Sequence, residues 1–394
     1  MTGRFAISTG DTLAVDGGAH TRDPLEFHRK LPGYRPTPLL TAPSLATSLG
    51  VAEVLVKDES SRLGLPAFKI LGASWAAYRA VVDRLGGEIE PWSTVAELAE
   101  RVASLKPFKL AAATDGNHGR AVARMAALMG FDADIYVPAG TAQARVDGID
   151  SEGASCTVVD GNYDDAIARS AKEAGERCLV ISDTSWPGYV DIPTWVIEGY
   201  GSILWEVEDQ LAERGDATPD IVVVQMGVGA LAAAVCGHYR RADAPSRPRL
   251  LGVEPLSADC ILESVEAGEI TTIDSAQDSI MAGLNCGTPS LLAWPLVSTA
   301  IDVYVAVDDD RAREGMRQLA SAGVVAGETG AAGLAGLIEL TQSADAEPAR
   351  KALGLDESSR VLVLSTEGAT DPEAYEQIVG RPQQAVASSS VPTT

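Results

Sequence analysis

A lysine stands in an apolar stretch at the expected start of a helix. The stretch Ala-Phe-Lys-Ile-Leu-Gly occupies positions 67–72, and Lys69 is its only charged residue. The partial positive charge at a helix N-terminus disfavours a cation, and apolar surroundings lower the pKa of an amine. Such an amine is suited to forming a Schiff base with a carbonyl compound. The alternative is a lysine whose stem lies on apolar surface while its ammonium group reaches water.

A polar turn follows the strand expected at 110–113. It reads Thr-Asp-Gly-Asn-His-Gly at 114–119 and opens another helix, so Asp115, Asn117 and His118 are expected at a strand end. Ligands of open parallel sheets bind where strand ends meet helix N-termini. The alternative is a tight turn in which Asp115 or Asn117 caps the helix and His118 is structural.

A glycine-containing loop follows the apolar strand expected at 221–225. Its residues are Gly227, Val228, Gly229, Ala230 and Leu231. Successive backbone N–H groups at a helix N-terminus form a cradle for an anion, which predicts a phosphate site. The same loop matches a loose dinucleotide fingerprint, with Glu254 where a ribose-binding acid would stand, so a nicotinamide-dependent oxidoreductase is a remote alternative.

Two further strand ends carry polar groups. Asp183 follows the strand expected at 179–182, and Ser365 and Thr366 end the strand expected at 361–365. A hydroxyl at such a place could bond a ring nitrogen, whereas the alternative for all three residues is a turn or a helix cap. The segment 279–287 is rich in glycine and apolar residues and is expected to form the wall of a pocket.

The elements that must position these residues alternate along the chain. Apolar strands are expected at 54–57, 110–113, 133–137, 155–159, 179–182, 221–225, 250–254 and 361–365. Helices are expected at 69–85, 118–129, 163–174, 202–214, 229–239, 311–322 and 331–340. This rhythm predicts an α/β fold with open, twisted parallel sheets. The first 30 or so residues are expected to form a tail or an arm over the body, and 383–394 a frayed end.

Composition limits the function further. The 394 residues carry 31 Lys and Arg against 55 Asp and Glu, a net charge of -24, which disfavours nucleic acid and anionic membranes as partners. We expect no transmembrane helix and no secretory signal. The five cysteines and four histidines are widely spaced, so we expect free thiols in a reducing cytoplasm and no metal site.

Taken together, these motifs resemble one enzyme family. Lys57–Ser60, the stretches at 67–72, 114–119, 183–186 and 227–230, Val253–Pro255, Met281–Leu284 and Ser365–Gly368 occur in a single order. That order resembles the pyridoxal-phosphate enzymes of the tryptophan synthase β-subunit fold (fold type II). Within them it is most similar to the diaminopropionate ammonia-lyases. The resemblance covers nearly the whole chain, from about residue 34 to 375.

The resemblance implies a role for each candidate residue. Lys69 matches the lysine that holds pyridoxal 5'-phosphate and moves protons at Cα, and Asn117 matches the asparagine at the cofactor's phenolic oxygen. The loop 227–231 matches the phosphate cradle. Thr366, or else Ser365, matches the hydroxyl at the pyridine nitrogen. Asp115 matches an aspartate that acts as a second base on the opposite face of the substrate, and Asp183 matches an acid that contacts the substrate amine.

The implied reaction is α,β-elimination of ammonia from 2,3-diaminopropionate or a close β-substituted analogue, giving pyruvate and ammonia. Two carboxylates suit a substrate that carries two ammonium groups. Serine or threonine dehydration, or β-replacement, on the same fold is the alternative. Asn285 stands where the family usually has alanine, so its amide either binds a polar substrate tail or points away from the site.

The resemblance also implies an organisation. We expect two α/β domains with the cofactor between them: a large cofactor-binding domain of residues 1–79 and 190–394, and a smaller mobile domain of residues 80–189. We expect a cytoplasmic homodimer. We expect it to bind a small-molecule amino acid substrate.

Overall fold

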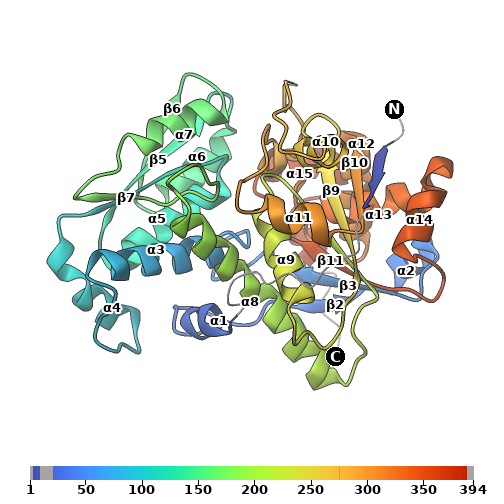
Figure 1. Ribbon diagram of the computed structural model, residues 1–394, viewed down its shortest axis with the longest axis horizontal. Helices are drawn as coiled ribbons and strands as arrows, with labels where there is room; N and C mark the ends of the chain where they lie inside the picture. Colours follow the sequence, from blue (N-terminus) through green and yellow to red (C-terminus); the bar gives the residue numbers. More distant parts are fainter. Residues whose placement is uncertain (1–2, 9–20, 275, 388–394) are drawn as a thin grey trace. The chain divides into compact units, whose positions relative to one another are not determined.

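The computed structural model describes residues 3–8, 21–274 and 276–387, which form two compact units (Figure 1). The larger unit comprises the described residues of Met1–His20, Pro36–Ser61 and Ile203–Thr394, and the smaller unit comprises Thr21–Arg35 and Arg62–Ser202. The smaller unit contains more residues than the domain expected at 80–189. It also includes residues 21–35, 62–79, where Lys69 lies, and 190–202. The mobility of that domain stays a prediction.

The larger unit contains a seven-stranded sheet in the order β1-β10-β9-β8-β11-β3-β2. The strands are β1 (Arg4–Ile7), β2 (Leu39–Thr41), β3 (Glu53–Asp58), β8 (Ile221–Gln225), β9 (Arg249–Pro255), β10 (Val303–Val307) and β11 (Arg360–Ser365). The five inner strands are parallel, whereas the edge strands β1 and β2 run antiparallel to their neighbours. The carboxyl ends of the inner strands therefore lie along one edge of the sheet.

Helices cover this sheet because its central strands are apolar on both faces. All five residues of β8 and of β10 are buried, the pattern of a strand between two layers. Helix α13 lies so close to the sheet that a Cβ at Gly336 would meet Val253 at 2.4 Å. The helices of this unit are α2 (Pro43–Leu49), α9 (Ala230–Arg240), α10 (Cys260–Ala267), α11 (Trp294–Ala300), α12 (Asp309–Ser321), α13 (Ala332–Gln342), α14 (Glu347–Leu353), α15 (Pro372–Val379) and α16 (Gln383–Ala387).

The smaller unit contains a four-stranded parallel sheet in the order β6-β5-β4-β7. Its strands are β4 (Lys109–Ala113), β5 (Asp132–Pro138), β6 (Ser155–Val159) and β7 (Cys178–Val180). Its helices are α1 (Asp23–His28), α3 (Ile70–Arg84), α4 (Val95–Arg101), α5 (Asn117–Met129), α6 (Gln143–Asp150) and α7 (Tyr163–Ala171). Helix α8 (Asp191–Arg214) begins in this unit and ends in the larger one. The predicted α/β class with open parallel sheets is confirmed.

Two glycines bring the start of α3 against α8 within the smaller unit. A Cβ at Gly72 would lie 2.5 Å from the Tyr200 ring, and one at Gly199 would lie 2.4 Å from the Leu71 carbonyl oxygen. Any larger residue at either position would push the helices apart. This close approach places Lys69, immediately before α3, near the ring of Tyr200, 6.0 Å from Nζ to the ring centroid.

The expected strands and helices correspond to β3–β9, β11, α3, α5, α7–α9, α12 and α13, with ends that differ by a few residues and with α8 beginning eleven residues earlier than expected. Strands β1, β2 and β10 were not expected. Where the first 30 residues are described, they are more regular than expected, because Arg4–Ile7 pairs with β10 and Asp23–His28 is helical. They do not form a tail, and that part of the expectation is wrong. Of the expected frayed end, 383–387 form α16, and 388–394 lie outside the described residues.

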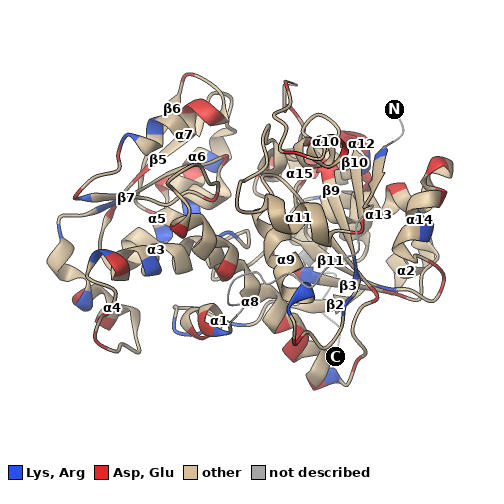
Figure 2. Cartoon of the chain, viewed as in Figure 1, with Lys and Arg blue, Asp and Glu red and all other residues tan. Residues whose placement is uncertain are grey.

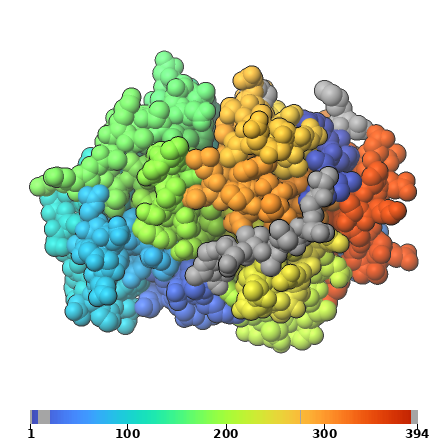
Figure 3. Space-filling model, viewed as in Figure 1, coloured from blue at the N-terminus to red at the C-terminus, as the bar shows by residue number. Residues whose placement is uncertain are grey.

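Strand β1 lies beside α14 at the surface of the larger unit (Figure 3). Acidic residues occur on helices of both units (Figure 2). In the described part of the chain, no helix is long and apolar enough to span a membrane.

Lys57 shows what a purely structural lysine looks like in this fold. Its side chain is fully buried, and its ammonium group donates to Glu206 (2.8 Å), to the Thr37 carbonyl oxygen (2.8 Å) and to Gln210 (3.0 Å). A buried ammonium group needs such a complete set of acceptors. The set leaves Lys57 no donor for a ligand.

Candidate active site

The site in the smaller unit is built around Lys69. This residue occupies the N-cap position of α3 and has helical dihedral angles. Its side chain therefore extends from the start of the helix rather than from its middle. Its Nζ donates to Asp183 Oδ2 at 2.7 Å and lies 5.5 Å from the centroid of the Phe68 ring. The Lys69 side chain is 18% exposed and that of Asp183 8%, so this ion pair is largely shielded from water.

Charge pairing overrides burial at both partners. Burial disfavours the ammonium form, but Asp183, and after it Tyr200 and Asp115, hold the pKa of Lys69 above its ordinary value. Burial likewise disfavours the carboxylate of Asp183, yet Lys69 and then His118 lower the pKa of Asp183. The expected low pKa of Lys69 is therefore wrong, because the apolar sequence around Lys69 does not reveal the carboxylates that the fold brings to it.

Two more side chains lie close to Asp183. The Tyr163 hydroxyl donates to Asp183 Oδ1 at 3.4 Å, and His118 Nδ1 lies 4.0 Å from Oδ2. His118 Nε2 is 2.8 Å from the Ile181 carbonyl oxygen, which can only accept, so Nε2 carries a proton. Burial lowers the pKa of His118 despite the nearby Asp183, which favours a neutral ring. With Nε2 protonated and the ring neutral, Nδ1 carries a lone pair, so among the described residues His118 packs beside the Asp183 carboxylate without donating to it.

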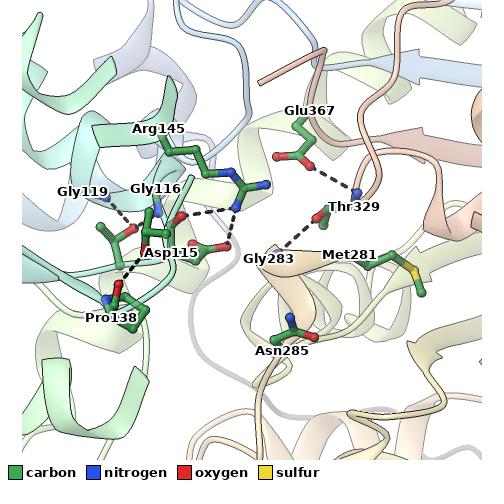
Figure 4. A network of polar contacts seen from close by, with 12 residues as sticks. Asp115, Gly116, Gly119, Pro138, Arg145, Met281, Gly283, Asn285, Thr329 and Glu367 are labelled. Atoms are coloured by element: carbon green, nitrogen blue, oxygen red, sulfur yellow. Dashed lines mark hydrogen bonds and ion pairs between the residues drawn. The ribbon is translucent and has the colours of Figure 1, made fainter. Parts of the chain in front are cut away.

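Asp115 lies at the strand end of β4 beside Arg145, a residue that the sequence did not single out. Arg145 Nη1 donates to the Asp115 carbonyl oxygen at 3.2 Å and lies 3.8 Å from Oδ2 (Figure 4). Gly116 has φ +145°, and a Cβ there would meet Arg145 at 3.1 Å. Glycine at 116 therefore lets the guanidinium group approach Asp115 closely.

The start of α5 is not capped by Asp115 or Asn117. The Thr114 hydroxyl instead accepts from the N–H groups of Gly116 (2.9 Å) and Gly119 (3.0 Å). Asn117 is the first residue of α5 and is half-buried. Because Thr114 does the capping, the side chains of Asp115 and Asn117 are not needed to end the turn.

The larger unit contributes the loop 227–231, which joins β8 to α9. Gly229 has φ +97° at the N-cap of α9, a conformation that favours glycine, and a Cβ at Gly227 would meet Cys286 Sγ at 3.1 Å. Within the described residues, no acceptor is found for the backbone N–H groups of 227–231. Five such donors at the start of a helix could bind an anion, and the phosphate site at 227–231 stays a prediction.

Gln225, at the end of β8, holds Thr366. Its two N–H groups are shared among three acceptors: Thr366 Oγ1 at 2.8 Å from Nε2, and the carbonyl oxygens of Thr329 and Leu364, each at 3.1 Å. Thr366 and Ser365 are both buried, but the described residues include no partner for the Ser365 hydroxyl. Of the two candidate hydroxyls, only that of Thr366 has a hydrogen bond to Gln225 among the described residues.

Asn285 uses its amide within its own loop. Its Nδ2 donates to the Ser279 carbonyl oxygen at 2.8 Å, and its Oδ1 accepts from the Ser279 N–H at 3.2 Å. This pairing closes the segment 279–285 and favours the alternative in which Asn285 does not bind substrate. On the same unit, the Gly283 N–H donates to Thr329 Oγ1, and the Thr329 N–H to Glu367 (Figure 4).

Glu254 is not placed as a ribose-binding acid would be. Its two carboxyl oxygens accept from the N–H groups of Ile261 (2.8 Å) and Leu262 (2.9 Å) at the start of α10, and it is fully buried. Burial raises the pKa of Glu254 well above its ordinary value. This arrangement removes the main support for a dinucleotide site.

Comparison with known proteins agrees with this geometry. Residues 30–366 match the family model described as pyridoxal-phosphate dependent enzyme. The diaminopropionate ammonia-lyases of Salmonella typhimurium and Escherichia coli are 37% and 38% identical to the chain, and each match covers 96% of both proteins. The crystal structure of the Escherichia coli enzyme in complex with D-serine has a TM-score of 0.87 at 37% identity, with 96% of both chains covered.

The chain belongs to the diaminopropionate ammonia-lyase family of pyridoxal-phosphate dependent enzymes.

The described residues fit the cofactor of this ammonia-lyase family. An anionic phosphate suits the row of N–H groups without acceptors at 227–231, and an aldehyde suits the amine of Lys69. For the proton of the Thr366 hydroxyl, no acceptor is found in the described part of the chain, which suits a ring nitrogen with a lone pair. Each requirement is met by a residue that the sequence motifs contain.

Three residues near the candidate sites of this ammonia-lyase were not predicted from the sequence. Gln225 was signalled only as a polar residue ending an otherwise apolar strand, and Tyr200 only as one aromatic residue of a long helix. Arg145 gave no signal, because its contact with Asp115 joins two helix starts 30 residues apart.

We expect Asp183→Asn to lower the pKa of the Lys69 amine in protein freed of pyridoxal phosphate. Removing the carboxylate leaves burial, which disfavours the ammonium form, opposed only by weaker partners. Because only the neutral amine is acylated, the midpoint of Lys69 labelling against pH, followed by mass spectrometry of peptides, should move to lower pH. Lys109, paired with Asp134 on the surface, serves as the internal control. An unchanged Lys69 midpoint contradicts the assignment of Asp183.

Proposed function

We propose that the chain catalyses α,β-elimination of ammonia from 2,3-diaminopropionate, with release of pyruvate and a second ammonia after hydrolysis. The observation that carries this proposal is the pairing of the Lys69 amine with Asp183, with Asp115 close enough to act on the same amine. Two carboxylates suit an amino acid with two ammonium groups, whereas a hydroxy amino acid carries only one. The family that the chain belongs to supports the same reaction.

Pyridoxal phosphate supplies the electron sink of this reaction when bound, and the protein supplies orientation and proton transfer. We propose that Lys69 holds the cofactor and moves the proton at Cα. The N–H groups of 227–231 would bind its phosphate, Asn117 its phenolic oxygen and Thr366 its ring nitrogen. Ser365 is the weaker candidate for the ring nitrogen, because Gln225 contacts Thr366.

Asp183 and Asp115 would act on the substrate. Asp183, held by Tyr163, would accept from a substrate ammonium group. Asp115, held beside Arg145, would take the Cα proton when the substrate has the opposite configuration. The site would then accept both stereoisomers, with Lys69 and Asp115 as bases on opposite faces.

We also propose that the enzyme is a cytoplasmic homodimer and that the smaller domain, residues 80–189, moves during the catalytic cycle. The five cysteines support a reducing compartment, because all of them are free thiols. The partner that we propose is the small amino acid substrate.

The decisive experiment compares substrates. Purified protein should release pyruvate from L-2,3-diaminopropionate with a higher kcat/KM than from L-serine or L-threonine. Lys69→Ala should lower kcat by roughly 10²–10⁴-fold, since it removes the proton-transfer group. Lys109→Ala, at a surface ion pair, is the matched lysine control and should retain activity. Faster turnover of serine or threonine would replace the proposal with a dehydratase.

Asp115→Asn should separate the two isomers of the substrate. We expect kcat for D-2,3-diaminopropionate to fall by roughly 10²–10⁴-fold, because the amide cannot accept the Cα proton. Turnover of the L isomer, which relies on Lys69, should fall by less than about tenfold. Initial rates of pyruvate release from each pure isomer measure both effects. Equal losses on the two isomers would remove Asp115 as the second base.

A further inference from the structure

The amide of Gln225 can take only one orientation in this structure. Its Nε2 lies 3.1 Å from two carbonyl oxygens, those of Thr329 and Leu364, which can only accept. Turning the amide over would place Oε1 against both carbonyl oxygens. The structure keeps the first orientation although it leaves the buried Oε1 without a partner among the described residues. Two backbone carbonyls therefore set the direction of the side-chain donor.

This orientation decides what the Thr366 hydroxyl can do. Because an amide nitrogen donates and does not accept, the Thr366 hydroxyl cannot donate to Gln225 Nε2, 2.8 Å away, and its own proton must point elsewhere. No acceptor for that proton is found among the described residues, and Thr366 is only 1% exposed. A buried donor without an acceptor is unfavourable, so a bound group should supply a lone pair.

We propose that Gln225 is a positioning residue that turns the Thr366 hydroxyl into a donor toward the pyridine nitrogen and so holds that nitrogen unprotonated. The inference rests on the proposed function, which places the cofactor ring at Thr366. An unprotonated nitrogen offers the lone pair that the hydroxyl proton lacks. A protonated nitrogen would need Thr366 as an acceptor and would leave the hydroxyl proton buried without a partner. The two carbonyl oxygens thus act on the ring through Gln225.

The protonation state has a chemical consequence. An unprotonated ring withdraws electrons less strongly than a protonated one, which favours prompt loss of a β-substituent over a long-lived carbanion at Cα. Gln225 would in this way favour elimination without touching the substrate. It is therefore a positioning residue for the reaction, and its effect should pass entirely through Thr366.

The test uses the holoenzyme loaded with pyridoxal phosphate labelled with ¹⁵N in the ring. In the unsubstituted protein, the ¹⁵N resonance should lie in the range of an unprotonated pyridine. In Gln225→Met no N–H group holds the Thr366 oxygen, so this oxygen can accept from a protonated ring nitrogen, and the resonance should move upfield toward that of a protonated pyridine. The Kd for pyridoxal phosphate should rise up to about tenfold, as for the loss of one hydrogen bond.

Further variants keep the test decisive. Gln225→Glu has the same shape but lacks the NH₂ group, and should move the resonance in the same direction if Gln225→Met does not fold. Gln318→Met is the matched control, since Gln318 also has a buried Oε1 without a partner among the described residues, and should change neither the resonance nor the Kd. If Gln225 acts through Thr366, the double variant Gln225→Met/Thr366→Ala should bind cofactor no more weakly than Thr366→Ala alone.

The outcomes separate this inference from the proposed function. An unchanged ¹⁵N resonance in a folded, cofactor-loaded Gln225 variant overturns the inference, as do losses in affinity that add in the double variant. If the unsubstituted protein binds cofactor, the resonance moves as expected, and diaminopropionate is not turned over, the proposed reaction fails while the role of Gln225 stands.

Discussion

A lysine at the start of a helix must find an anion, and in this chain Asp183 supplies it. The 2.7 Å contact joins residues 114 positions apart, from the start of α3 and the strand end of β7. It depends on the glycines that let α3 approach α8 and on the parallel sheet that brings its strand ends to one edge. Without Asp183, a shielded ammonium group before an apolar helix would be unfavourable. Tyr163, His118 and Asp115 lie near this pair.

In the proposed function, the smaller unit places a carboxylate beside a cation, whereas the larger unit binds an anion, the phosphate of the cofactor. It would do so in a protein with a net charge of -24. Its donors would be the backbone N–H groups of 227–231 at the start of α9. They act over a short range, so they can bind a phosphate although the protein as a whole is negatively charged. Gln225, two residues before this loop, ties β8 to the hydroxyl after β11. In the proposed function, the two strand ends would provide a phosphate cradle and a directed hydroxyl from neighbouring strands of one sheet.

From the sequence, the alternating buried strands and helices could be predicted, and so could the polar motifs that follow the strand ends. Apolar runs located β8 and β11 because burial on both faces leaves an uninterrupted pattern. Strand β2 escaped because three residues carry no period, and β1 because it pairs with a strand about 300 residues away. Lys69 was recognised by its setting, but its raised pKa was not predicted, since that depends on carboxylates distant in sequence. Thr114 was overlooked as the cap because Asp115 and Asn117 were equally suitable by residue type.

The central claim is that Asp183 recognises positive charge, first that of Lys69 and then that of the substrate. The most direct measurement compares Kd for L-2,3-diaminopropionate and L-serine on cofactor-loaded Lys69→Ala protein, with and without Asp183→Asn. The two ligands differ mainly in the β-ammonium group. The account predicts that the preference for diaminopropionate falls at least about tenfold when Asp183 loses its charge, as for the loss of a charge-assisted hydrogen bond. The same preference in both proteins would contradict it.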